Sequence, residues 1–122
     1  MELRELTYAI NGAIFEVHNT LGEGFLEKVY ENALLIELEK LGIHAQSQVP
    51  VEVIYKNEVV GEYVADIVVE DSIILELKTV DELTALHQAQ LMNYLKASGK
   101  KIGLLINFKG PKAIIKRIIA DE

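Results

Sequence analysis

The first third of the chain has hydrophobic residues at helical spacing. Four aliphatic residues recur three or four positions apart: Leu6, Ile10, Ile14 and Val17. This spacing predicts an amphipathic helix over about residues 3–19. Residues 21–24 (LGEG) form a glycine-rich break, and we expect a second helix from about 25 to 41. Gly42 is well placed to follow its last turn, because glycine readily adopts the left-handed conformation found there.

From residue 46 the pattern changes to that of strands. Residues 51–55 (VEVIY) and 59–69 (VVGEYVADIVV) flank a turn candidate at 56–58. This turn lacks the glycine that a tight hairpin usually carries. After a polar loop at 70–72, the segment 73–80 (IILELKTV) has the composition of a strand buried on both faces.

The last third predicts one helix and two strands. Asp81 resembles the N-cap of a helix over about residues 82–98. Four leucines lie on its expected apolar side: Leu83, Leu86, Leu91 and Leu95. Two strands follow at about 101–108 and 112–119, around Gly110-Pro111. Three strands in succession favour an antiparallel meander, and the strand after the helix is expected to add in parallel. The fold class is therefore α/β (α+β).

The composition agrees with a globular domain and excludes several classes of protein. Of the 122 residues, 50% are hydrophobic and 25% are charged, so we expect one folded domain over residues 1–122. The absence of cysteine excludes a disulfide framework and thiolate metal sites. No apolar run approaches the roughly 18 residues of a membrane span. We expect a cytoplasmic protein without a membrane partner.

The distribution of charge changes the interpretation of the net charge. The value of −7 argues at first against a nucleic-acid partner. However, residues 1–82 contain 17 acidic and 5 basic residues, whereas residues 83–120 contain seven basic residues and no acidic one. This asymmetry indicates either a basic surface for phosphate groups or solvated lysines at the tips of a helix and strands. For the first alternative, the candidates are Lys96, Lys100 and Lys101.

Two carboxylates are predicted to face each other in the hairpin around residues 70–72. A three-residue loop pairs residue 69 with residue 73, and counting back along both strands sets Asp66 opposite Glu76. Lys78 lies two residues further on the same face as Glu76. Opposed carboxylates repel each other, which raises the pKa of one of them unless a cation lies between them.

A hard divalent cation would resolve this repulsion. Oxygen ligands from Asp66 and Glu76, with the backbone carbonyl of Leu77, suit Mg²⁺. Lys78 would then hold a scissile phosphate or help to form the attacking hydroxide. The alternative is an ordinary ion pair between Lys78 and one carboxylate on a half-exposed strand. The residues of the hairpin alone leave both interpretations open.

The predicted helix after this hairpin carries polar residues on one face. His87, Gln90 and Tyr94 share that face because they are three and four positions apart. Glutamine is rarely a core residue, so its position beside a tyrosine favours a site. The alternative is a solvated Gln90 with Tyr94 at the rim of the core. His87 is a supporting candidate that also fits a surface or capping role.

These motifs resemble those of a known superfamily over nearly the whole chain. Asp66 followed by Glu76-Leu77-Lys78 resembles the D…(D/E)xK signature of the PD-(D/E)XK nuclease superfamily. The segment from Gln90 to Tyr94 is similar to the QxxxY motif of its RecB-like and exonuclease branches. Residues 24–30 (GFLEKVY) match the motif of the GxxExxY family within that superfamily. Two further stretches are similar to this family: GLLIN and NYLKASG. Ala65 stands where the superfamily name has proline.

The resemblance implies a restriction-endonuclease-like αβββαβ core with a mixed central sheet flanked by helices. It also implies that Asp66 and Glu76 are metal ligands and Lys78 is the catalytic lysine. Glu27 would contact a metal or its water from the helix before the sheet. Its alternative role is that of a solvated acid in a first helical turn, where the helix dipole favours it.

The same resemblance gives the other motif residues lesser roles. Gln90 would orient the site or contact phosphate, and Tyr94 would support it. Tyr30 is expected to be a structural, packed aromatic, and Gly24 to precede the start of the helix.

The expected function is hydrolysis of a phosphodiester bond in nucleic acid, with DNA as the expected substrate and Mg²⁺ or Mn²⁺ as the cofactor. We expect target choice to come from a homodimer or a partner protein, because the chain has no evident recognition module. One alternative is a non-catalytic nuclease-fold module that binds nucleic acid or protein, which the net acidity favours. Another is a hydrolase of small phosphorylated molecules.

Overall fold

The computed structural model describes residues 1–120, and its elements follow the predicted order. The helices are α1 (Leu3–Leu21), α2 (Glu27–Lys40) and α3 (Ala85–Ser98). The strands are β1 (Ala45–Tyr55), β2 (Glu58–Val69), β3 (Ile73–Lys78), β4 (Ile102–Asn107) and β5 (Ile114–Ile119). None of the helices in this part of the chain is long and apolar enough to cross a membrane.

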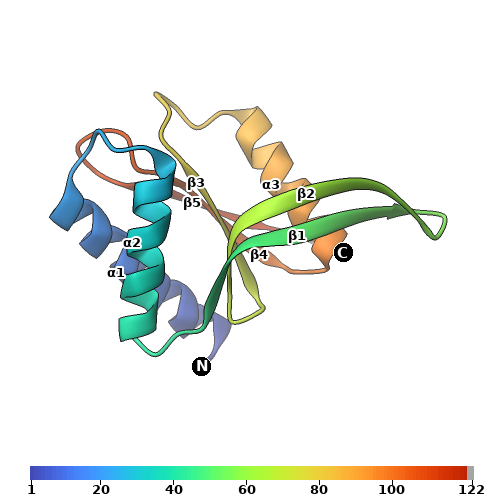
Figure 1. Ribbon diagram of the computed structural model, residues 1–122, viewed down its shortest axis with the longest axis horizontal. Coiled ribbons are helices and arrows are strands. Elements are labelled where there is room, and N and C mark those ends of the chain that lie inside the picture. Colours follow the sequence, from blue (N-terminus) through green and yellow to red (C-terminus); the bar gives the residue numbers. More distant parts are fainter. Residues whose placement is uncertain (121–122) are drawn as a thin grey trace.

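The five strands form one mixed sheet in the order β1-β2-β3-β4-β5. Neighbouring strands are antiparallel except for β3 and β4, which are parallel because α3 returns the chain between them. The predicted meander and the parallel addition after the helix are both confirmed. Figure 1 shows the outer part of β1 and β2 extending from the body as a two-stranded ribbon. We call the portion from residue 52 to residue 62 the hairpin arm.

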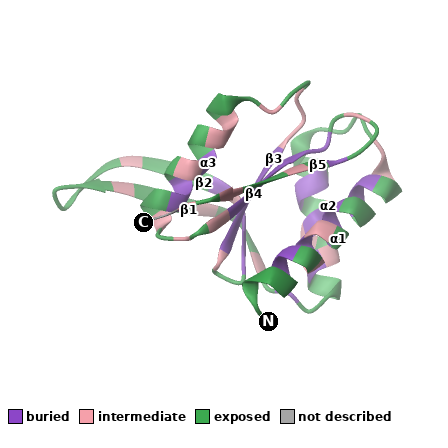
Figure 2. Ribbon diagram, turned by 180° about the vertical axis from the view of Figure 1, so that it is seen from behind, coloured by how far each residue is buried: buried purple, intermediate pink, exposed green. Residues whose placement is uncertain are grey.

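Helices cover both faces of the sheet and create two hydrophobic clusters. The larger cluster joins α1 and α2 to β3 and β4, with Ile10, Leu34 and Leu75 fully buried. The smaller one joins α3 to the other face, with Leu91 packed on the strands. Figure 2 shows buried residues along the central strands and exposed residues over most of the hairpin arm. The result is a three-layer α+β fold with the sheet in the middle.

Gly103 in β4 explains how closely α3 approaches the sheet. A Cβ atom at this position would lie 2.9 Å from Cδ1 and Cγ of Leu91, which is closer than packed carbon atoms allow. Glycine therefore permits α3 to pack directly on β4.

The turn of the first hairpin is shorter than predicted and does not need glycine. It consists of Lys56 and Asn57, because Tyr55 already pairs with Glu58. Both turn residues have positive φ angles, 48° and 69°. Two-residue hairpins favour this left-handed pair of conformations, and asparagine tolerates it better than most residues.

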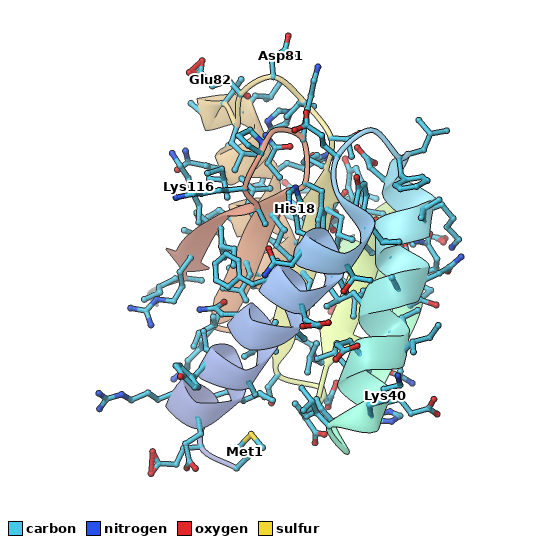
Figure 3. The ribbon with its side chains drawn as sticks, turned by 90° about the vertical axis from the view of Figure 1, so that its left-hand side faces the viewer. Met1, His18, Lys40, Asp81, Glu82 and Lys116 are labelled. Atoms are coloured by element: carbon cyan, nitrogen blue, oxygen red, sulfur yellow. The ribbon has the colours of Figure 1, made fainter. Side chains whose placement is uncertain are left out.

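The start of α3 also differs from the prediction. The N-cap is Thr84, not Asp81, and Thr84 forms a capping box with His87. Asp81 lies in the loop before the helix, at the end of the molecule far from Met1 (Figure 3), and forms an ion pair with Lys109. Leu86, expected on the apolar side, is 77% exposed, because it lies five residues before the buried Leu91 and therefore about 140° around the helix from it.

The alternation of side chains along β2 is interrupted before Ile67. Residues two positions apart on a strand normally share a face, but Ile67 packs under α1 and α2 whereas Ala65 belongs to the cluster under α3. The pairing of β1 with β2 passes over Gln48 and Asp66, and Gln48 has a φ of 53°. The side chain of Gln48 instead donates to both carboxylate oxygens of the buried Glu31, at 3.1 and 3.2 Å. The regular alternation of faces is therefore broken next to Asp66.

Candidate active site

The hairpin of β2 and β3 brings Asp66 and Glu76 together in the predicted register. Val69 pairs with Ile73, and the ladder continues to Ile67 and Leu75. At the next position the side chains replace backbone partners. The Leu77 N–H donates to Oδ2 of Asp66 at 2.8 Å, and the Asp66 N–H donates to Oε1 of Glu76 at 3.3 Å. The two strands are thus held together across the pair by their carboxylates.

The electrostatics of this pair favour a cation. Glu76 is only 8% exposed, and burial raises its pKa to about 9, with the negative charge of Asp66 as the next cause. The positive charge of Lys78 acts in the opposite direction but is a smaller effect. Without a metal, Glu76 therefore keeps its proton at neutral pH. A divalent cation between the carboxylates would remove both the repulsion and the proton.

The oxygen atoms of this pair fit a hard divalent cation, but Glu27 does not join them as predicted. Within residues 1–120, no group of three or more His, Cys, Asp or Glu side chains is placed to hold a metal. Glu27 lies in the first turn of α2, where its Oε2 accepts a hydrogen bond from the Thr79 N–H at 3.1 Å. The carboxylate of Glu27 is thus hydrogen-bonded to Thr79, the first residue after β3. The carbonyl of Leu77 is placed by the same strand, whereas its side chain is buried in the larger core cluster.

Lys78 is the last residue of β3 and is half-buried. It lies on the same face as Glu76, two residues away, and its charge affects the pKa of Glu76. Its backbone carbonyl accepts from the Phe108 N–H at 2.9 Å. Pairing with β4 therefore fixes the end of β3 from which the Lys78 side chain extends.

Asn107 is a positioning residue that the sequence motifs did not single out. It is 4% exposed at the end of β4, opposite Lys78. Its amide donates to the Val80 carbonyl at 2.8 Å and accepts from the Val80 N–H at 3.1 Å. The sequence does contain a signal for such a role, because Asn107 is a polar residue at the end of the apolar run GLLIN. These two hydrogen bonds fix the backbone directly after Lys78.

Helix α3 brings Gln90 and Tyr94 to the carboxylate pair. Gln90 Nε2 donates to Oη of Tyr94 at 3.2 Å. The pKa of the Tyr94 hydroxyl is raised, first by burial and then by the charges of Glu76 and Asp66, so this hydroxyl lies within their field. The ring of Tyr94 also contacts that of Tyr63 on β2, with centroids 5.6 Å apart. Tyr63 was not predicted as a site residue.

His87 shares the Gln90 face of α3 but is used in the helix cap. Its Nδ1 accepts from the Thr84 N–H at 3.0 Å, and its own N–H donates to Oγ1 of Thr84 at 3.3 Å. The structure therefore shows the capping role, one of the alternatives for this residue, and its supporting role at the site stays a prediction.

Tyr30 organises the glycine-rich connection before α2. Its hydroxyl donates to the Gly22 carbonyl at 2.7 Å and accepts from the Phe25 N–H at 3.3 Å. Its ring stacks on Phe108 with centroids 4.4 Å apart. These contacts set where α2 begins, and so where Glu27 lies. The expected packed, structural role of Tyr30 is confirmed.

Two of the lysines predicted to contact a nucleic-acid backbone lie at the wrong end of the sheet. Lys100 and Lys101 precede β4, whose first residue pairs with the first residue of β3. Lys78 is at the other end of β3, roughly 17 Å away at about 3.3 Å per residue. Lys100 is also bound to Asp71 in the β2–β3 loop, at 3.2 Å. Lys96, in the last turn of α3, is exposed and lines the same groove as Gln90 and Tyr94.

Comparisons with known proteins agree with this architecture. A family model described as "PD-(D/E)XK nuclease superfamily" matches residues 4–118. The crystal structure of SSO0001 is similar with a TM-score of 0.60 and 22% identity, over 78% of this chain and 50% of that one. This chain therefore spans half the length of SSO0001. A search of curated protein sequences gave no match.

A second similar structure is an alkaline exonuclease (LHK-Exo) from Laribacter hongkongensis. It matches with a TM-score of 0.55 and 9% identity, over 88% of this chain and 76% of that one. At such low identities both structural similarities concern the fold. They place a mixed sheet between helices, as found here, in proteins that include a nuclease.

Proposed function

This chain belongs to the PD-(D/E)XK nuclease superfamily, and from that premise we propose that it hydrolyses phosphodiester bonds of DNA with Mg²⁺ or Mn²⁺. The observation that carries the proposal is the pairing of Asp66 with the buried Glu76, whose pKa is raised to about 9 by burial first and by the negative charge of Asp66 second. Nucleases of this superfamily generally use divalent metals. A carboxylate held at such a pKa is poorly explained as a structural group, but it fits a cation site.

The residues around the pair have distinct tasks in this mechanism. Asp66 and Glu76, with the Leu77 carbonyl, would hold the cation, which supplies Lewis acidity for the phosphate and for an attacking water. Lys78 carries a fixed positive charge on the same face and would stabilise negative charge developing on the phosphate. Asn107 holds the chain after Lys78, so that the ammonium group stays in position.

The helix α3 would support the metal site from the side. The hydrogen bond from Gln90 to Tyr94 fixes the tyrosine hydroxyl near the carboxylates. This hydroxyl would hydrogen-bond a carboxylate or a phosphate oxygen, and Gln90 would orient it. The exposed Glu27 is held by Thr79, and in our proposal its carboxylate would contact the metal or a water molecule at the end of β3.

We also propose that the chain belongs to the GxxExxY branch of the superfamily. Gly24 has a φ of 108°, which side-chain-bearing residues rarely adopt. Tyr30 fastens the same connection to Gly22 and Phe25. Glu27 lies between them and reaches β3. Each residue of the motif thus has a physical role in placing one carboxylate at the end of the central strand.

The test is cleavage of plasmid and short oligonucleotide DNA with Mg²⁺, Mn²⁺ or EDTA. Wild type should cut only with metal, and Glu76→Ala should lose the activity at least about 100-fold. Glu62→Ala removes an exposed carboxylate from the same strand as Asp66 and is the matched control, with unchanged activity expected. Equal cleavage by wild type and Glu76→Ala would refute the proposal. Binding without cleavage under either metal would favour the non-catalytic module.

A further inference from the structure

An open groove lies next to the candidate active site, between α3 and the hairpin arm. Its volume is about 780 Å³. The arm contributes Val53, Ile54 and the neighbouring Tyr63, and α3 contributes Leu86, Asn93 and Tyr94. Figure 1 shows α3 alongside the ribbon of β1 and β2 that forms the other wall. The groove is large enough for a nucleobase with its sugar.

The walls of the groove combine apolar surface with an exposed aromatic ring. Leu86 is 77%, Ile54 is 55% and Tyr63 is 48% exposed. The ring of Tyr63 leans on Tyr94 at an interplanar angle of 40°, which leaves much of Tyr63 open to solvent. Exposed apolar side chains gathered in one groove mark a binding surface. An exposed ring offers a stacking platform for any base.

The charges around the groove suit an anionic ligand. None of its lining residues is acidic, and Lys96 is among them. The arm carries three glutamates. Glu58 pairs with Tyr55 next to the turn and does not line the groove. Glu52 and Glu62 form the cross-strand pair next to Val51 and Tyr63. Neighbouring pairs project to opposite faces of a ribbon. Both glutamates therefore point away from the face that Tyr63 presents to α3.

Tyr94 links the groove to the carboxylate pair. Gln90 and Tyr94 line the groove, and the Tyr94 hydroxyl lies in the field of Glu76 and Asp66. A strand with a phosphate at the carboxylates would therefore extend a neighbouring nucleotide toward Tyr63. Asn93 and Gln90 offer amide groups to the edge of a base along this path.

We propose that this groove binds an unpaired nucleobase of single-stranded nucleic acid, stacked on Tyr63 beside the phosphate held at Asp66 and Glu76. The inference rests on the proposed function and specifies the substrate as single-stranded. A base within a duplex is already stacked and cannot enter an apolar groove. Duplex binding would instead need a row of cations for the two backbones, and the groove offers one lysine.

The test is fluorescence anisotropy at fixed salt in Ca²⁺, with gels to verify intact DNA. The probes are an oligothymidylate of about 12 nucleotides, an abasic oligomer of equal length and a duplex. Tyr63→Ala should weaken binding of oligothymidylate by roughly 5- to 100-fold, the range for loss of one base–aromatic stack. It should leave the abasic oligomer unchanged, because that probe keeps the phosphates and lacks the bases. Tyr63→Phe should bind like wild type.

Tyr55→Ala is the matched control, since Tyr55 is a 61% exposed tyrosine on the same arm but outside the groove. It should bind all probes like wild type. Equal losses for Tyr55→Ala and Tyr63→Ala, or equal losses for oligothymidylate and abasic oligomer, would overturn the inference. So would a dimer, detected by light scattering, that Tyr63→Ala dissociates without changing DNA binding. If the groove does not bind a base, cleavage that depends on metal and on Glu76 should still be observed. A negative result for the groove is therefore distinguishable from a negative result for the proposed nuclease activity.

Discussion

Replacing Glu76 with glutamine should stabilise the metal-free protein at alkaline pH. The pKa of Glu76 is about 9 in the folded chain and 4.5 as the reference value. The folded state therefore binds the proton more tightly than the unfolded state does. This contribution to stability is fully present below pH 4.5 and is lost as the pH rises through 9. Glutamine has no such proton to lose.

The expected magnitude follows from the width of this pH window. Each pH unit inside it changes the free energy of unfolding by about 1.36 kcal/mol. Between pH 5.5 and 8.5 the wild type should therefore lose about 4 kcal/mol more stability than Glu76→Gln. This is an upper figure, because water reaching the site would reduce the difference. The difference should be much larger than for an exposed carboxylate.

The assay is urea unfolding at both pH values in EDTA, followed by circular dichroism. Glu62→Gln, an exposed site on β2, serves as control and should follow the wild type. The reasoning is refuted if Glu76→Gln and wild type lose equal stability between the two pH values. It is also refuted if glutamine destabilises the protein more at pH 8.5 than at pH 5.5.

Three further predictions follow from the same contacts. Mg²⁺ added at pH 8 should raise the urea midpoint of the wild type and have little effect on Glu76→Gln, because the cation replaces the proton; an equal rise in both would contradict the proposed site. Lys78→Ala should reduce cleavage at least about 100-fold with a melting temperature near that of wild type, and retained cleavage would exclude its catalytic role. Gly103→Ala should lower the free energy of unfolding by about 1–3 kcal/mol. The double variant Gly103→Ala/Leu91→Ala should lose less stability than the sum of the losses of the two single variants, since the side chains at these positions would occupy the same space. Additive losses in the unfolding data would contradict that contact.

The order of elements and the register of the central hairpin were predictable from sequence. Both depend on local patterns: helical spacing before residue 41, alternation and apolar runs after it, and the three-residue loop between Val69 and Ile73. Because the side-chain period of a strand is two, the loop length alone determines that Asp66 meets Glu76. The chemical expectation of a raised carboxylate pKa follows from that register and the apolar neighbours.

Other features depended on contacts between distant segments. The capping box of Thr84 and His87 competed successfully with Asp81, which instead pairs with Lys109 from the β4–β5 connection. The end of the sheet at which Lys100 lies follows from the parallel pairing of β3 with β4, which the sequence did predict, so this position could have been inferred from the predicted topology. The pairing of Asp81 with Lys109 leaves no signal in a hydrophobic pattern, because it depends on which chain segments come together in the fold.

Periodicity and one short loop are enough to predict the strands, the helices and the facing carboxylates of Asp66 and Glu76. The surroundings of these carboxylates depend on tertiary packing. In the folded chain the Thr79 amide donates a hydrogen bond to Glu27. Tyr94 lies within the field of the two carboxylates, and Tyr63 lies across a groove from α3. The physical reason is that burial and electrostatic fields come from residues far apart in the chain, and their distances are defined only once the sheet and its helices pack together.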